Sequence, residues 1–222
     1  MRIFAAMKFQ FWLWVVIFAY ILPLFAQETT LSPSSLPTTV KTSTNPAFKA
    51  GEWFKFRIHY GIFNASYATI ELREAEWNGK PAFYAKGIGR TTGLARFFFK
   101  VDDYYSSYFT KDDNRPLHFI RNINEGGYKK HLKIDFDHLK KQATVIDIKK
   151  ETTGIYNTDP DIQDLISFVY YLRKQLDVNA IKKDEFVVVN LFFDSENYAF
   201  KFKFVGIETI KTKFGKVKTL KF

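Results

Sequence analysis

From Glu52 onward the chain alternates apolar and polar side chains, and this alternation constrains the fold more than any other feature. In EWFKFRIHY, Phe54 and Phe56 alternate with Lys55 and Arg57, and YKKHLKIDF repeats the pattern. Successive side chains of a strand point to opposite faces of a sheet. The alternation therefore predicts antiparallel strands with one face packed on a core and the other in water.

Turn residues separate these strands at short intervals. Asn78-Gly79 is a two-residue hairpin signal, and Glu125-Gly126-Gly127 and DHLKK mark two further tight turns. Short turns connect strands that are neighbours in the sheet. We therefore expect a meander in which each strand pairs with the next.

One segment, NTDPDIQDLISFVYYLRKQL (157–176), has helical spacing instead. Its apolar residues recur three or four apart, which predicts one amphipathic helix. Asp159 is suited to the N-cap and Pro160 to the first helical position, while Arg173 and Lys174 suit the last turn. The predicted fold class is mainly β (α+β), a curved antiparallel meander sheet or half-barrel that wraps this central helix.

The first 26 residues have the layout of a secretory signal peptide. Arg2 and Lys8 precede an uncharged run that ends at Ala26 and is followed by polar residues. We expect cleavage after Ala26; the alternative is a retained membrane anchor, because the run is about long enough to span a bilayer. Either way the rest of the chain is expected outside the cytoplasm.

Residues 27–47 are rich in Thr, Ser and Pro and predict a flexible linker, so the folded domain is expected over 48–222. The chain has no cysteine, which excludes disulfides and thiolate sites. The formal charge is +10, which falls to +8 when Arg2 and Lys8 are removed. An exported basic protein could meet anionic lipids or glycans, but nucleic acid is not an expected partner.

Three features occur together over roughly residues 48–222: a Gly-Glu start, the stretch from Thr92-Gly93 through FFFKVDDYYSS, and Pro-x-x-Phe followed by Glu-Gly. With this set the folded part resembles the DUF3108 family, exported bacterial proteins of uncharacterised function common in Bacteroidetes. The resemblance implies a location in the periplasm or associated with the outer membrane of a Gram-negative bacterium. It implies further strands after the last one here, so we expect a domain that is shortened at its C-terminus, at Phe222. It implies no catalytic residues, and by analogy of fold it is similar to envelope carriers of the lipoprotein-localisation type.

The stretch RFFFKVDDYYSS (96–107) holds the main candidate site. Leu94, Phe97, Phe98 and Val101 have the spacing of a short helical turn with one apolar side, and a strand follows from Asp102. Five aromatic residues could form the mouth of an apolar pocket: Phe97, Phe98, Phe99, Tyr104 and Tyr105. The alternative is that the phenylalanines fill one end of the core, and their exposure distinguishes the two interpretations.

The acids do not form a recognisable catalytic or metal motif. Asp102 and Asp103 are neighbours in a strand, so they face opposite ways and cannot share a proton; pairing of this acid pair with Arg90 or Arg96 is expected. No nucleophile elbow, zinc motif or phosphate loop occurs in the sequence. We expect no cofactor, no metal and no enzymatic activity; a hydrolase would need acids that converge from distant strands, such as Glu71 with Asp103.

A lysine stripe near the end of the chain is the second candidate site. Its members often lie two apart, which places them on one strand face: Lys201, Lys203, Lys211, Lys213, Lys216 and Lys218. Such a face could adsorb to anionic lipid or glycan. The alternative is a solvated face whose lysines protect a sheet edge.

The leading functional hypothesis is a non-catalytic envelope protein that holds an apolar ligand, such as a lipid or a lipidated partner, between helix and sheet. It rests on an aromatic dry face that exceeds what one helix can cover: Phe54, Phe56, Tyr60, Phe136 and Phe192. The alternative is a glycan- or cell-wall-binding module that uses exposed Trp53 and Trp77 on the other face.

Overall fold

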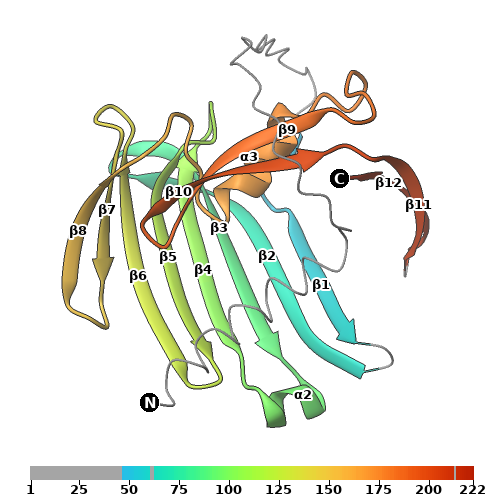
Figure 1. Ribbon diagram of the computed structural model, residues 1–222, viewed down its shortest axis with the longest axis horizontal. Coiled ribbons are helices and arrows are strands. Elements are labelled where there is room, and N and C mark those ends of the chain that lie inside the picture. The colour runs from blue at the N-terminus through green and yellow to red at the C-terminus, as the bar shows by residue number, and fades with distance from the viewer. Residues whose placement is uncertain (1–46, 61–62, 213) are drawn as a thin grey trace, which may run out of the picture. The chain divides into compact units, whose positions relative to one another are not determined.

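An eight-stranded antiparallel sheet dominates the computed structural model, which describes residues 47–60, 63–212 and 214–222. Its strands lie in chain order, and the sheet curves around a helix without closing into a barrel (Figure 1). The strands are β1 (Trp53–Tyr60), β2 (Phe63–Trp77), β3 (Lys80–Thr91), β4 (Asp102–Thr110), β5 (Pro116–Glu125), β6 (Tyr128–Asp137), β7 (Gln142–Asp147) and β8 (Thr152–Asn157). The predicted meander is confirmed, and β8 is an addition to the predicted strands.

Two of the predicted turns have the backbone that a tight hairpin requires. Asn78 and Gly79 join β2 to β3 with φ of 51° and 76°, and Gly126 and Gly127 join β5 to β6 with φ of 56° and 94°. Positive φ at both central positions is the type I′ pattern, whose twist matches that of the flanking strands. These turns therefore set the register of two neighbouring strand pairs.

The register divides the sheet into two faces, named here inner and outer. One row of paired residues on the inner face runs from β2 to β7: Leu72, Ala85, Ser107, Phe119, Ile134 and Val145. All six are buried, and most belong to the hydrophobic core. The outer face carries the intervening residues, as the alternation predicts.

The central helix, α3, spans Ser167–Gln175 and lies over the inner face. Its existence is confirmed, but the predicted start at Asp159 and Pro160 is wrong. Gln163 forms a parallel bridge with Leu191 of β9 instead, and its N–H donates to the Asn190 carbonyl at 2.8 Å. The backbone of this segment finds its partners in a strand far along the chain, so it does not coil into the helix.

Asp164 caps the helix in place of Asp159. One oxygen of its carboxylate accepts the backbone N–H groups of Ile166 at 2.7 Å and Ser167 at 2.8 Å, and its other oxygen accepts the Ser107 hydroxyl at 2.6 Å. These donors satisfy part of the unpaired helix start. Burial nevertheless raises the pKa of Asp164 to about 6. The Ser107 contact ties the start of the helix to the middle of β4.

Two further hairpins follow α3. The first pairs β9 (Phe186–Phe193) with β10 (Glu196–Lys203), and it crosses in front of the sheet (Figure 1). The second pairs β11 (Gly206–Thr212) with β12 (Gly215–Lys221). Phe168 of α3 stacks on Phe202 of β10 at 6.4 Å, so the first hairpin and the helix form a joint cover for the inner face.

Candidate ligand-binding face

Helix α3 and the segment before it cover only part of the inner face. Tyr170 stacks on Phe109 at 5.3 Å between ring centroids, and Ile166 lies over Gly87. A Cβ at Gly87 would be 3.0 Å from the Ile166 side chain, so glycine allows this close approach. The covered part is a packed core.

Arg173 marks where this cover ends toward β1. Its guanidinium binds both carboxylate oxygens of Glu52, at 2.8 and 3.1 Å, and lies 5.4 Å from the ring centre of Phe54. A two-point Arg–carboxylate bond of this kind has a fixed geometry. The end of α3 is thereby held above Phe54, the first aromatic residue on the inner face of β1.

Beyond Arg173 the inner face remains apolar but is not covered by α3. Phe56 stacks on Phe54 at 6.2 Å and is 48% exposed, and Ile58 is 37% exposed. The register places Phe56 beside Ala68, which in turn lies beside Gly89. Ala68 and Gly89 have little or no side chain, so the surface beside Phe56 is shallow; we name Ala68 and Gly89 the floor.

A charged cluster borders this floor on β4 to β6, and we name it the inner polar cluster. It comprises Asp103, Tyr105, Arg121, Glu125, Lys130 and Asp194. Asp194 lies in the turn of the β9–β10 hairpin and accepts a hydrogen bond from Arg121 at 2.6 Å and another from Lys130. The hairpin tip is thus attached to the sheet by two cations. The Arg121 Nε is buried and lacks a hydrogen-bond partner among the described residues.

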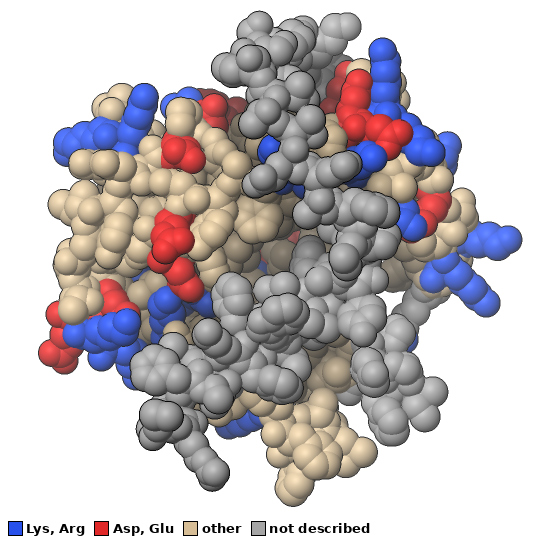
Figure 2. Space-filling model, viewed as in Figure 1, with Lys and Arg blue, Asp and Glu red and all other residues tan. Residues whose placement is uncertain are grey.

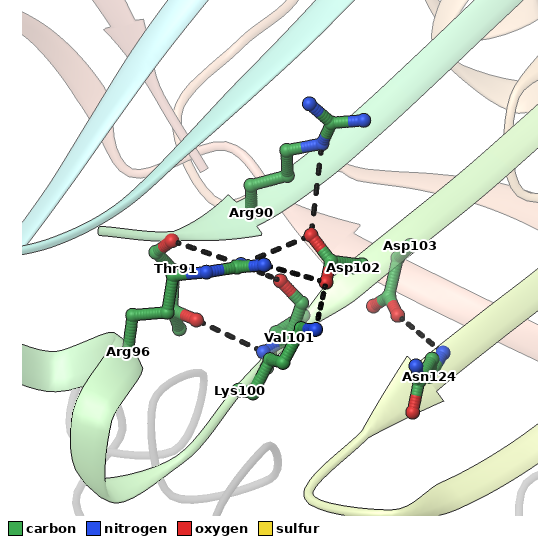
Figure 3. A network of polar contacts seen from close by, with 8 residues as sticks. All are labelled: Arg90, Thr91, Arg96, Lys100, Val101, Asp102, Asp103 and Asn124. Atoms are coloured by element: carbon green, nitrogen blue, oxygen red, sulfur yellow. Dashed lines mark hydrogen bonds and ion pairs between the residues drawn. The ribbon is translucent and has the colours of Figure 1, made fainter.

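Asp103 is the most perturbed acid of the cluster. It is 5% exposed, and one carboxylate oxygen accepts the Asn124 backbone N–H at 3.2 Å (Figure 3). Burial, and after it the nearby Glu125 carboxylate, raise the pKa of Asp103 to about 7. The Asn124 N–H and the Arg121 charge each lower this pKa by less than Glu125 raises it. Near neutral pH this carboxyl group can therefore donate or accept a hydrogen bond.

The structure does not gather the five predicted aromatic residues into one pocket mouth. Phe97 is 85% exposed and Phe98 is 81% exposed, so the interpretation in which they fill the core is wrong. Phe99 packs instead against Gly126, where a Cβ would fall 2.2 Å from its ring. Tyr104 lies on the outer face and shares a hydrogen bond of 2.8 Å with the Tyr84 hydroxyl, while Tyr105 faces inward.

Asp102 has the structural role expected of it, on the opposite face from Asp103. Arg96 donates to both of its carboxylate oxygens at 3.0 and 2.8 Å, and Arg90 and Lys100 lie 3.7 Å away (Figure 3). Arg96 also donates to the carbonyl of Val101 at 3.3 Å. The hydrogen bond from Arg96 lowers the pKa of Asp102. Two adjacent aspartates thus have pKa values shifted in opposite directions.

The predicted lysine stripe lies on two separate hairpins. The register places Lys211, Lys216 and Lys218 on one face of β11–β12, whereas Lys201 and Lys203 belong to β10. Lys203 pairs with Asp184 at 2.7 Å. Lys213 lies outside the described residues. Lysine and arginine side chains project from the β11–β12 side of the molecule in Figure 2.

Specific contacts account for other acids of the sheet. Glu71 pairs with Lys86 on the outer face, so the suggestion that Glu71 converges with Asp103 is wrong. His118 lies 2.7 Å from Asp135. Within 47–60, 63–212 and 214–222, no three His, Cys, Asp or Glu side chains come together as a metal site. In the same ranges, every helix is too short or too polar to cross a bilayer.

The fold and this face define an open antiparallel sheet with a helical cover over part of its inner face. The family model described as protein of unknown function (DUF3108) matches residues 55–222. The chain belongs to this family, as the resemblance predicts. No curated protein and no solved structure matches it.

The inner polar cluster was not predicted from the sequence. Glu125 was assigned only to a turn, and Arg121, Lys130 and Asp194 were not singled out. Part of the cluster can be recognised in the sequence as charged residues at positions of β5 and β6 that should face the core. Arg121 and Lys130 occupy such positions, because they alternate with outward-facing residues in step with the apolar ones.

Proposed function

We propose that the protein is a non-catalytic exported protein that binds an amphiphilic ligand, such as a lipid or a lipidated partner, on the part of its inner face that α3 does not cover. The observation that carries the proposal is the exposure of Phe56 and Ile58 on the face that elsewhere forms the core. Apolar groups on a sheet face are normally covered by a packed layer. Here the part covered by α3 ends at Arg173, which leaves an apolar surface for a ligand.

The charged border gives the ligand a direction. Apolar chains would lie on Phe54, Phe56 and Ile58, and a polar head group would lie toward the inner polar cluster. Because the apolar surface is bordered by these charged groups, we infer that the ligand is amphiphilic rather than purely hydrocarbon.

The experiment is mass spectrometry of organic-solvent extracts from the protein purified from its native compartment. Wild-type protein is expected to release one lipid species in near-stoichiometric amount. The double variant F56S/I58S is expected to release at least tenfold less while remaining folded, because both side chains are substantially exposed. The matched control is W53S, which removes a 59% exposed aromatic residue from the outer face of the same strand. An extract without lipid from folded wild-type protein would refute the proposal.

A second candidate function, binding of glycan or cell-wall polymer, is favoured by an aromatic row on the outer face. Trp77 stacks on His118 at 4.6 Å and lies 4.8 Å from Tyr108. Aromatic rings on an accessible sheet face can stack on sugar rings. Co-sedimentation with insoluble cell-wall polysaccharide tests this candidate, and W53S and W77A, rather than F56S/I58S, are expected to weaken it.

A further inference from the structure

Helix α2 (Gly93–Phe98) presents its apolar side chains to solvent rather than to the core. Leu94, Phe97 and Phe98 are 67%, 85% and 81% exposed, and no residue of the helix is buried. The two phenylalanine rings contact each other edge to face at 5.5 Å. Figure 2 shows an uncharged protrusion at the position of α2, at the lower end of the molecule. Two adjacent aromatic rings at a tip have no packing role within the described fold.

Contacts on the other side of α2 hold the helix in place. Arg96 binds Asp102 through two hydrogen bonds and reaches the Thr91 and Val101 carbonyls at 3.4 and 3.3 Å (Figure 3). Phe99 packs on Gly126 of the next turn. The helix is therefore clamped to the sheet by polar groups and one ring, while its remaining aromatic residues point outward. This arrangement presents the exposed rings at a fixed place, which reduces the entropy lost on binding.

The sheet end that carries α2 is also basic at its surface. In the ranges 90–103, 123–130 and 147–152, the exposed charged residues are one acid, Glu151, and five bases: Arg90, Lys100, Lys129, Lys149 and Lys150. The other acids in these ranges are buried or partly buried: Asp102 binds Arg96 and lies 3.7 Å from Arg90 and Lys100, and Asp147 lies 4.0 Å from Lys150. Bases still outnumber acids among the charged residues of these ranges. Arg90, Lys129 and Lys149 line a hollow of about 350 Å³ next to α2.

We propose that this end of the sheet, named here the α2 rim, docks on an anionic lipid bilayer. Phe97 and Phe98 would enter the boundary between head groups and acyl chains, and the five exposed bases would lie against the anionic head groups. Aromatic side chains combined with nearby Lys and Arg are the usual composition of surfaces that lie in a membrane interface. The charge of the rim favours an anionic bilayer over an apolar protein surface as the occupant.

The α2 rim is separate from the inner-face ligand site, and its test needs no bound ligand. The experiment is co-sedimentation of the full chain with vesicles of phosphatidylglycerol and phosphatidylcholine or of phosphatidylcholine alone. Wild-type protein is expected to bind the anionic vesicles and to bind less at high salt, because exposed charges are screened. F97S/F98S is expected to lower binding roughly 10- to 100-fold, from the apolar area of two rings. K129Q/K149Q should lower binding to anionic vesicles only.

Matched controls come from parts of the surface outside the α2 rim. L139S removes a 98% exposed apolar side chain from the turn between β6 and β7, and K182Q/K183Q removes two exposed lysines elsewhere. Both are expected to bind as wild type. Because residues 1–46 are identical in all variants, any affinity of that segment for vesicles is common to them. Equal binding by wild type and F97S/F98S would overturn the proposal.

A second measurement locates the contact directly. F98W places a fluorophore at the tip, and its added emission is expected to be quenched by vesicles that contain brominated phosphatidylglycerol. Phe98 is 81% exposed, so this substitution should leave the fold intact, which circular dichroism can verify. Added emission that brominated lipid leaves unquenched would overturn the proposal, whether or not the inner face carries a lipid.

Discussion

Replacing Asp103 by asparagine should make the protein more stable at neutral pH and change how its stability depends on pH. In the folded protein the pKa of Asp103 rises from an ordinary value of 3.8 to about 7, chiefly because the carboxyl group is buried. The folded state therefore binds more protons than the unfolded state between these two values. In that range the contribution of Asp103 to the free energy of unfolding falls as pH rises, and above pH 7 the loss is complete.

The size of the effect follows from the shift. One pKa unit corresponds to about 1.4 kcal/mol, so a shift of about three units makes ionised Asp103 cost about 4 kcal/mol at pH 8. Asparagine keeps an oxygen that can accept the Asn124 N–H and an amide that can donate toward Glu125. D103N should therefore gain stability over wild type as pH rises from 4 to 8, with a difference of up to about 4 kcal/mol.

Urea unfolding followed by tryptophan fluorescence, at several pH values and constant ionic strength, measures this difference. The neighbouring variant D102N is the control, because Arg96 lowers the pKa of Asp102 and the sign is reversed. Ionised Asp102 stabilises the fold, and this contribution is present above its unfolded pKa and is lost in acid, so D102N should lose stability relative to wild type as pH rises from acid. Parallel curves for D103N and wild type between pH 4 and 8 would refute the assignment of a buried, protonatable carboxyl group.

Three further predictions concern packing around the two sites. G126A should destabilise the protein by about 2–3 kcal/mol in urea unfolding, because φ is +56° and the new Cβ would displace Phe99; an unchanged midpoint would contradict this packing. Y170F should be neutral or stabilising by up to about 1 kcal/mol in thermal unfolding, since the hydroxyl is buried without a partner among the described residues, and a clear loss would reveal a hidden partner. R173M should cost about 1–3 kcal/mol by removing the two-point bond to Glu52, whereas K182M, at an exposed lysine, serves as control; equal effects would argue against the Arg173–Glu52 contact.

The local features of the fold could be predicted from the sequence, because each depends on residues close together in the chain. Asn78-Gly79 permits positive φ at two consecutive positions, which a type I′ hairpin needs. The alternation in β1 and β6 assigns faces without knowledge of the rest of the molecule. The spacing of Leu94, Phe97, Phe98 and Val101 predicts a short helical turn, and α2 forms at Gly93–Phe98, but the sequence does not predict that its phenylalanines point outward.

Two errors have a common cause in long-range pairing. Local capping residues predict that the helix begins at Asp159. The backbone of Gln163 is instead hydrogen-bonded to β9, and this strand pairing outweighs the local preference for a helix. Strand β8 was missed because TTGIYN has a glycine in its interior and no clear alternation, and only its pairing with β7 defines it. In both places the partner strand outweighs local preference.

By itself the sequence determined the meander of strands, the presence of one central helix and the family, because turn chemistry and side-chain periodicity act over a few residues. Only the tertiary structure decided how far α3 covers the inner face and which charges meet on it. Arg121 and Asp194 are 73 residues apart, and they meet because the β9–β10 hairpin crosses the sheet. Strand register and hairpin placement depend on contacts between distant segments. These contacts place the exposed apolar residues of β1 and the floor beside the inner polar cluster.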